Sequence, residues 1–267
     1  MKKFWKVVKI VLLVLLALIV LIAAVITVFA VKNNKQVKAC IETTLAEVSE
    51  NHTVREIDTG DYGEMTMYGV LKVHSKQYEI EDLGNLSVMT VNAGVMQMAT
   101  VIFSPFDKDL PLLSCDYMYM LSNRTAYVEF YDLVEVKTPA YMKWMERYEE
   151  LRTRYGDLED TEASSGWYDY LITVAIYKKA AAAQDARAIA LLGDAVSLYM
   201  DQADACPLLD AEARQTKIAA VKAYSDRLID EGGVSTSLFK AALGEEVTRD
   251  FFDQVFFGTA KAKAMAK

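Results

Sequence analysis

One acidic residue, Asp116, lies where a carboxyl group could perform acid–base chemistry. The alternating side chains of residues 116–121 predict a strand that begins at Asp116. Asp116 then shares a face with Met118 and Met120. A carboxyl group held against such apolar, polarisable side chains has a raised pKa, and a carboxylic acid that stays protonated near neutral pH can donate a proton to a substrate. The alternative is a solvated acid at the end of a strand.

Other familiar catalytic patterns are missing. The sequence has no phosphate-binding glycine loop, no dinucleotide fingerprint, no nucleophile elbow and no zinc motif. The two histidines, His52 and His74, stand outside any Cys/His cluster. We therefore expect no metal site, and carboxylates remain as the acid–base groups.

Seven segments in the middle of the chain are typical of strands. Short turns join most of them, and such connections make antiparallel neighbours. The sequence therefore predicts an antiparallel meander followed by one more strand. The predicted strands are residues 65–73, 77–80, 86–91, 95–103, 116–121, 126–131 and 170–177.

Helices are predicted before, between and after these strands. The first is a short amphipathic helix with Ile41, Leu45 and Val48 on its apolar edge, and Pro139 opens a second. Helices in these positions can cover both faces of one sheet. The remaining helices are predicted at 183–203, at 211–228 and on either side of Gly244, and the tail 259–267 is expected to fray.

An apolar segment of 22 residues, Ile10 to Val31, precedes the domain and carries no charge. At about 1.5 Å per residue, a helix of this length crosses a hydrocarbon core of roughly 30 Å. The segment is too long for a signal peptide, and no cleavage site follows it. We therefore predict a single-pass anchor in residues 1–34 and one domain in residues 35–267. A lipid attached to Cys40 is the alternative.

The charge of the chain is unevenly distributed. The first 38 residues hold seven lysines and no acid, and the other 229 hold 22 basic and 37 acidic side chains, a net of −15. Such an acidic domain is a poor nucleic-acid binder. Four lysines and the terminal amine precede the apolar segment and three lysines follow it, which favours a domain on the extracytoplasmic side. The odd number and wide spacing of the three cysteines give no disulfide framework.

Three sequence matches point to one family. They are Pro-Leu-Leu-Ser-Cys-Asp at 111–116 with Asp132-Leu133 after the next strand, Trp167 with Asp169, and the helical segment 238–258. Together they span about residues 60 to 258 in the right order. In these segments the chain resembles the ferredoxin-dependent bilin reductases, whose fold is shared by the red chlorophyll catabolite reductases.

The resemblance implies an α+β fold, a three-layer α/β/α sandwich with a central antiparallel sheet, here preceded by one transmembrane helix. Such enzymes bind an open-chain tetrapyrrole between the sheet and the C-terminal helices. They hold no metal or flavin, take single electrons from ferredoxin or flavodoxin, and protonate the substrate radical. The proton donor falls on Asp116, and Trp167 falls on an aromatic residue near the pigment. Met118 and Met98 suit the pocket wall, although methionine at strand spacing is also typical of plain core.

The sequence departs from the family at three places. A histidine present in some members falls on Ala99, a polar pocket run reads Gly232-Gly233-Val234-Ser235, and no arginine stands just ahead of Trp167. Three hypotheses follow. The motif at Asp116 favours a membrane-anchored reductase of a bilin-like tetrapyrrole. The departures favour a non-catalytic module that binds a tetrapyrrole or another hydrophobic ligand at the membrane, and the third hypothesis is a ligand-free interaction domain.

The acidic charge also bears on the electron donor. Ferredoxins and flavodoxins are acidic, so a domain at −15 repels them unless basic residues gather on one face. Lys178 with Lys179, or the lysines of the C-terminal tail, are the candidates for such a patch.

Overall fold

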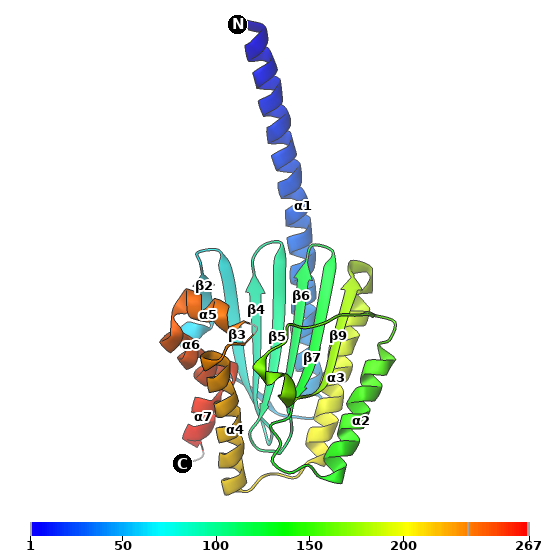
Figure 1. The fold of residues 1–267 in the computed structure, drawn as a ribbon, viewed down its shortest axis with the longest axis vertical. Helices are drawn as coiled ribbons and strands as arrows, with labels where there is room; N and C mark the ends of the chain where they lie inside the picture. The colour runs from blue at the N-terminus through cyan, green and yellow to red at the C-terminus, as the bar shows by residue number, and fades with distance from the viewer. Residues whose placement is uncertain (1, 234, 266–267) are drawn as a thin grey trace.

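The computed structural model describes residues 2–233 and 235–265, with side chains described from 4–233 and 235–263. It consists of one long helix, α1 (Lys2–Ser49), and a layered domain. The first part of α1 projects from this domain, and the last part packs against the sheet (Figure 1). Among the described residues, α1 is the one helix long and apolar enough to span a membrane, by length and composition. The short helix that we predicted around Ile41 is the lower part of α1. Residues 32–40 contain no glycine or proline, so nothing ends the helix there.

A nine-stranded antiparallel sheet forms the middle layer. Its order is β1-β3-β4-β5-β6-β7-β9-β8, and β2 also pairs with β3. The predicted meander is confirmed as β3 to β7. The strands are β1 (Val54–Ile57), β2 (Glu64–Met67), β3 (Leu71–Ile80), β4 (Gly84–Asn92), β5 (Met96–Pro105), β6 (Leu112–Met120), β7 (Asn123–Tyr131), β8 (Glu159–Asp160) and β9 (Ile172–Ala181).

Three of the strand predictions were wrong in detail. The predicted strand 77–80 is the second half of β3 (Leu71–Ile80). The segment 65–73 is two strands, because Tyr68 (φ 51°) and Gly69 (φ 70°) turn the chain back on itself. The alternation of apolar and polar side chains continues through this turn, so the sequence pattern did not reveal the turn. Asp116 is the fifth residue of β6 and not the first, because β6 begins directly after Pro111. Asp116 therefore lies in the middle of the sheet, where its neighbours shield it from solvent.

Helices cover both faces of the sheet, which confirms the α/β/α arrangement (Figure 1). One face packs against the lower part of α1 together with α2 (Pro139–Arg154) and α3 (Asp185–Ala205). The other face packs against the C-terminal helices and the short helix η2 (Trp167–Leu171). The C-terminal helices are α4 (Ala211–Asp230), α5 (Thr236–Leu243), α6 (Glu245–Phe251), the π-helical turn η4 (Phe252–Phe256) and α7 (Thr259–Met265).

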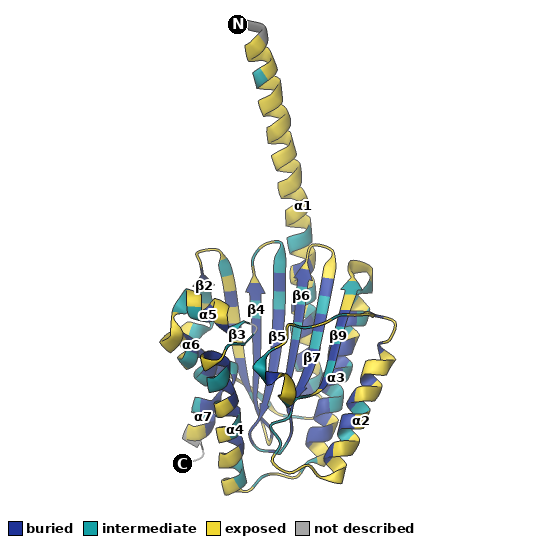
Figure 2. Ribbon diagram, in the orientation of Figure 1, coloured by how far each residue is buried: buried dark blue, intermediate teal, exposed yellow. Residues whose placement is uncertain are grey.

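Burial changes along α1 at the point where it reaches the sheet (Figure 2). Above this point its side chains are almost all exposed. Below it, one side chain per turn is buried against α3 and the sheet, at Asn33, Val37, Cys40, Thr44 and Val48. The same helix therefore carries an apolar exposed segment and a packed part of the domain.

The C-terminal tail differs from its prediction. We expected residues 259–267 to fray, but Thr259–Met265 forms α7, and residues 266 and 267 lie outside the described residues. Lys261 Nζ donates to Gln77 Oε1 (2.8 Å) and to the Asp58 carbonyl (2.9 Å), and Ala262 is buried. These tertiary contacts hold the tail against the sheet.

Candidate functional site

A cavity between the sheet and the C-terminal helices contains Asp116. Strands β4 to β7 form its floor, and α4, α5 and η4 form its roof. Its volume is about 90 Å³. The polar groups on its walls include Thr100, Ser114, Asp116, Glu129, Tyr131 and Tyr224, and Met89, Phe252 and Phe257 are among its apolar side chains.

Two hydroxyl groups from the sheet hold the Asp116 carboxylate. Thr100 lies directly opposite Asp116 on β5, and its Oγ1 donates to Asp116 Oδ1 at 2.5 Å. Ser114 Oγ donates to Oδ2 at 3.4 Å. Burial of the carboxyl group raises the pKa of Asp116 to about 6, since the charge of Glu129 adds to this effect and the two hydroxyl bonds only partly oppose it. The carboxyl group can therefore gain and lose a proton near neutral pH, as the alternation of the strand predicted.

Glu129 is a second acid at this site that we did not predict. It lies opposite Ser114 on β7 and accepts hydrogen bonds from the Tyr131 and Tyr177 hydroxyl groups, both at 2.7 Å. Burial and the bonds to Glu129 raise the pKa of both tyrosines far above the ordinary value, so both stay protonated. The alternation of β7 was visible in the sequence, but only the strand register shows that Glu129 faces Asp116's side of the sheet.

Met98 and Met118 lie opposite each other, two residues along β5 and β6 from Thr100 and Asp116. They share the face of Asp116 but lie outside the lining of the cavity, which instead includes Met89. Their role in binding stays a prediction.

Trp167 lies at the edge of the C-terminal helices and is half-buried. Its Nε1 donates to the Gly232 carbonyl at 2.8 Å, and the Arg227 guanidinium stacks 3.9 Å from its ring centre. The neighbouring Tyr168 lines the cavity. Trp167 therefore fixes the segment that closes the site, and its contact with a ligand remains a prediction.

The position that faces Asp116 is Thr100 and not Ala99, which we had aligned with the family's histidine. Ala99 lies opposite Tyr117, and both residues point into the core on the other face. A shift of one residue along a strand reverses the face, so counting back to Ala99 did not identify the residue that faces Asp116. The hydroxyl of Thr100 is therefore the group that this chain presents where a proton-sharing partner of Asp116 would stand.

The two glycines near residue 232 have packing roles. Gly232 has φ 95° and accepts the Trp167 hydrogen bond. Gly233 lines the cavity, and a Cβ there would lie 2.7 Å from Leu228 and 2.8 Å from Thr236. A larger residue at 233 would therefore push the side chains of Leu228 and Thr236 aside. Val234 of the same run lies outside the described residues.

The basic patch that we considered at Lys178 and Lys179 is not present as predicted. Lys178 is buried, and its Nζ donates to Asp160 Oδ1 at 2.6 Å. Only Lys179 of this pair is exposed. In the tail, Lys261 is bound to Gln77 as described above, and Lys263 is exposed.

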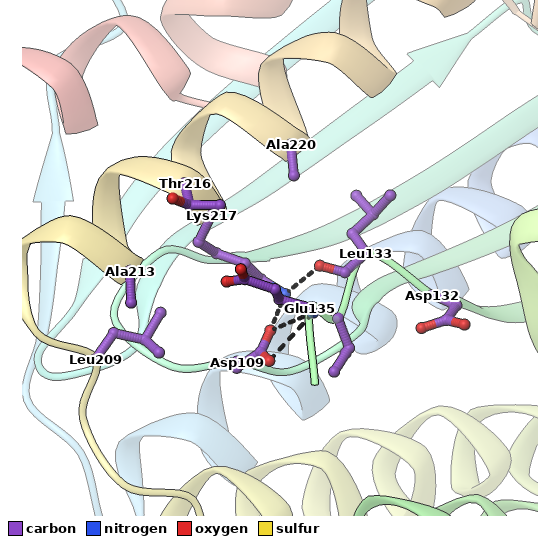
Figure 3. A pocket seen from close by; sticks show the side chains of 10 residues that line it. Asp109, Asp132, Leu133, Glu135, Leu209, Ala213, Thr216, Lys217 and Ala220 are labelled. Atoms are coloured by element: carbon purple, nitrogen blue, oxygen red, sulfur yellow. Dashed lines mark hydrogen bonds and ion pairs between the residues drawn. The ribbon is translucent and has the colours of Figure 1, made fainter. Parts of the chain in front are cut away.

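A second cavity, of about 320 Å³, lies beside α4 at the lower end of the sheet (Figure 3). Lys217 is buried in its wall, and its Nζ donates to the carbonyls of Leu110 and Leu133 (both 2.6 Å) and to Asp109 Oδ1 (3.1 Å). Asp109 also accepts the backbone amides of Glu135 and Val136. All three protons of the ammonium group have acceptors, so this cluster ties loops to α4. Sequence reasoning missed it.

Among the described residues, no group of three or more His, Cys, Asp or Glu side chains is arranged to hold a metal ion. The ionisable and hydrogen-bonding groups of the first cavity include Asp116, its two hydroxyl partners and the Glu129–tyrosine group. This arrangement can hold one exchangeable proton next to a largely apolar space.

Comparisons with known proteins identify the fold. No protein-family model and no curated protein matches this sequence. The crystal structure of selenomethionine phytochromobilin synthase from tomato in complex with biliverdin does match, with a TM-score of 0.70 and 11% identity over 84% of this chain and 83% of that chain. The chain therefore has the bilin reductase fold.

Proposed function

We propose that this protein is a membrane-anchored reductase of an open-chain, bilin-like tetrapyrrole. Asp116 carries the proposal, because it is an acid with a pKa of about 6 in the cavity between the sheet and the C-terminal helices. The tomato protein of the same fold is described in complex with biliverdin, which supports a tetrapyrrole as the ligand class. The apolar part of α1 is the proposed single-pass anchor, with the domain on the extracytoplasmic side.

In the proposed reaction, two electrons and two protons add to one double bond of the tetrapyrrole. A ferredoxin or flavodoxin on the same side of the membrane as the domain supplies the electrons one at a time and is itself oxidised, and no cofactor is bound to the protein. With the domain on the extracytoplasmic side, this donor must be an exported or membrane-bound carrier. Asp116 Oδ2 gives one proton to the substrate radical and regains a proton from solvent, while Thr100 holds Oδ1. The second proton comes from water that enters the site. The acidic domain requires the donor to dock near exposed lysines such as Lys179 and Lys263.

The site must open before such a ligand can enter. Its volume of about 90 Å³ is below the roughly 300–1,000 Å³ of sites that enclose drug-sized ligands. Part of the roof is the short helix α5, which is joined at Gly244 (φ 82°) to the short helix α6. We propose that these helices move away from the sheet on binding and expose Asp116.

A binding module without catalysis is the second candidate. The observation that favours it is Thr100, because a hydroxyl group cannot relay a proton to Asp116 as readily as an imidazole can. In this case the site would still bind a tetrapyrrole or another hydrophobic ligand.

The test uses the full chain in lipid nanodiscs, titrated with biliverdin and followed by its absorption bands. A low-potential reductant with ferredoxin or flavodoxin is then added. We expect a band shift on binding and a new product spectrum on reduction, and Asp116→Asn keeps the shift but loses the product. Binding without turnover supports the second candidate. No shift with biliverdin, bilirubin or haem contradicts the reductase and the binding of a tetrapyrrole by the second candidate.

A further inference from the structure

The two ends of the sheet differ in charge. At one end, which we call the turn end, the β2–β3, β4–β5 and β6–β7 turns (residues 68–70, 93–95 and 121–122) contain no charged residue. At the opposite end, the connections 81–83, 106–111 and 132–138 each contain at least one acid. In a domain with a net charge of −15, three neighbouring turns without a charge need an explanation. The acids at this end of the sheet lie beside β9, where Asp185 pairs with Arg124.

The turn end meets α1 where the apolar segment stops. Gln97 Nε2 at the start of β5 donates to the Ala30 carbonyl (2.8 Å), and Asn33 Nδ2 donates to the Leu121 carbonyl (3.3 Å). Val31 is the last residue of the apolar segment. At about 1.5 Å per residue, the turn end lies within one helical turn of that boundary. Because α1 continues unbroken into the core, the domain cannot swing away from this position (Figure 1).

Large apolar side chains are exposed at the turn end. Val70 is 73% exposed, Tyr68 54%, Met120 44% and Leu121 40%. The Tyr68 hydroxyl also donates to the Leu238 carbonyl, which brings the exposed Leu238 of α5 to the same end. Exposed apolar side chains that gather on one surface of a soluble domain mark an interaction site.

Two exposed lysines stand beside this apolar end. Lys32 and Lys35 follow the apolar segment directly on α1. Lysines that directly follow a membrane-spanning segment attract the anionic headgroups of a bilayer. Apolar turns next to basic residues are thus suited to a lipid surface, whereas the acidic opposite end is repelled by it.

A ladder of methionines runs from the turn end to Asp116 on a single face of the sheet. Met96 lies opposite Met120, Met98 lies opposite Met118, and the next pair is Thr100 and Asp116. None of the four methionines is fully buried. These flexible side chains adapt to ligands of different shapes, so the ladder is an apolar surface that leads from the turn end to the acid, on the face of the sheet opposite to α1.

We propose that the turn end is seated in the surface of the lipid bilayer, with the outer pair of the ladder, Met96 and Met120, in contact with lipid. A ligand dissolved in the membrane then has a direct apolar route to Asp116. The inference rests on the proposed anchor, but it does not depend on binding or turnover of a tetrapyrrole.

The test places a fluorescent label on single introduced cysteines of the full chain, in vesicles of phosphatidylcholine and phosphatidylglycerol. Cys40 and Cys115 are buried, and Cys206→Ser removes the third native thiol. Val70→Cys and Met120→Cys report on the turn end. Leu18→Cys reports on the anchor itself, and Leu208→Cys is the matched exposed apolar position at the acidic end.

Lipids with a nitroxide near the headgroup are the quencher. We expect the labels at 70 and 120 to lose about half of their emission, because interfacial side chains lie about 5–10 Å into the headgroup boundary. The label at 208 keeps its emission, and the label at 18 is quenched by lipids with a nitroxide deep in the acyl chain. Quenching at 18 with none at 70 or 120 overturns this inference and leaves the anchor intact. No quenching at 18 contradicts the anchor as well.

Discussion

Two ionisable groups inside the domain, Asp116 and Lys217, differ in how their surroundings satisfy their hydrogen bonds. Lys217 is buried and Asp116 is partly buried. Lys217 has an acceptor for each of its three protons, including the charged Asp109. Asp116 has one short and one long hydrogen bond from hydroxyl groups, and its nearest charged neighbour in the cavity is another acid, Glu129. Burial lowers the pKa of Lys217, but Asp109 opposes that effect.

The difference separates a structural cluster from a site for chemistry. A buried charged group with a full set of hydrogen bonds holds loops together. The protein loses stability when any partner of that group is removed. A buried acid with incomplete partners costs stability, and folds retain such groups chiefly where they act on a ligand. Cavity volume does not make this distinction, since the larger cavity is the one beside Lys217.

Lys217→Met is expected to have the largest effect on stability. It leaves Asp109 and two carbonyl groups without their buried donor, which costs about 3–5 kcal/mol. Chemical unfolding of the full chain in detergent measures this loss. Lys143→Met, at an exposed position on α2, is the control and changes stability by less than about 0.5 kcal/mol. A loss at Lys217 as small as the control would show that the cluster is not structural.

Asp116→Asn is expected to raise stability where the carboxyl group is ionised. The native pKa of about 6 lies above the ordinary 3.8, so the folded state binds the proton more tightly and the ionised group is destabilising. Such a shift corresponds to roughly 3 kcal/mol, which partial solvent access lowers to about 2 kcal/mol. The gain is full above about pH 6 and disappears below about pH 4, where both states are protonated.

Unfolding curves at several pH values check this prediction. Asp157→Asn is the matched control, because hydrogen bonds from Arg187 lower the pKa of Asp157 and its removal brings no gain at any pH. If Asp116→Asn were destabilising at neutral pH, the carboxylate would be a structural group like Lys217.

Much of the fold could be predicted from the sequence, but little of the register between strands could. Alternation in β6 placed Asp116 on the methionine face, and Pro139 correctly marked the start of α2, where Thr138 caps the helix. Facing partners depend on register, and so Ala99 was chosen where Thr100 stands. Two of the three acceptors of Lys217 are backbone carbonyls 84 and 107 residues away, and a carbonyl group has no residue type by which a sequence could reveal it.

Thr100→Val is expected to have a moderate effect. It keeps the shape of the side chain but removes the hydrogen bond that favours the ionised carboxylate, so the pKa of Asp116 rises further. At neutral pH the loss of this bond costs about 1 kcal/mol. Carbon-13 NMR of labelled aspartate follows the titration. Thr90→Val, on the opposite face of β4, leaves the pKa of Asp116 unchanged.

Glu129→Gln is expected to have the smallest effect and the opposite sign. The charge of Glu129 raises the pKa of Asp116, so a neutral amide of the same shape lowers that pKa toward its ordinary value. The amide oxygen still accepts from one of the two tyrosines, which limits the loss of stability. The same NMR titration measures the shift. Opposite shifts of the Asp116 pKa in the Thr100 and Glu129 variants mean that both neighbours set this pKa. An unchanged pKa in Glu129→Gln would leave burial as the only effect that keeps the acid protonated.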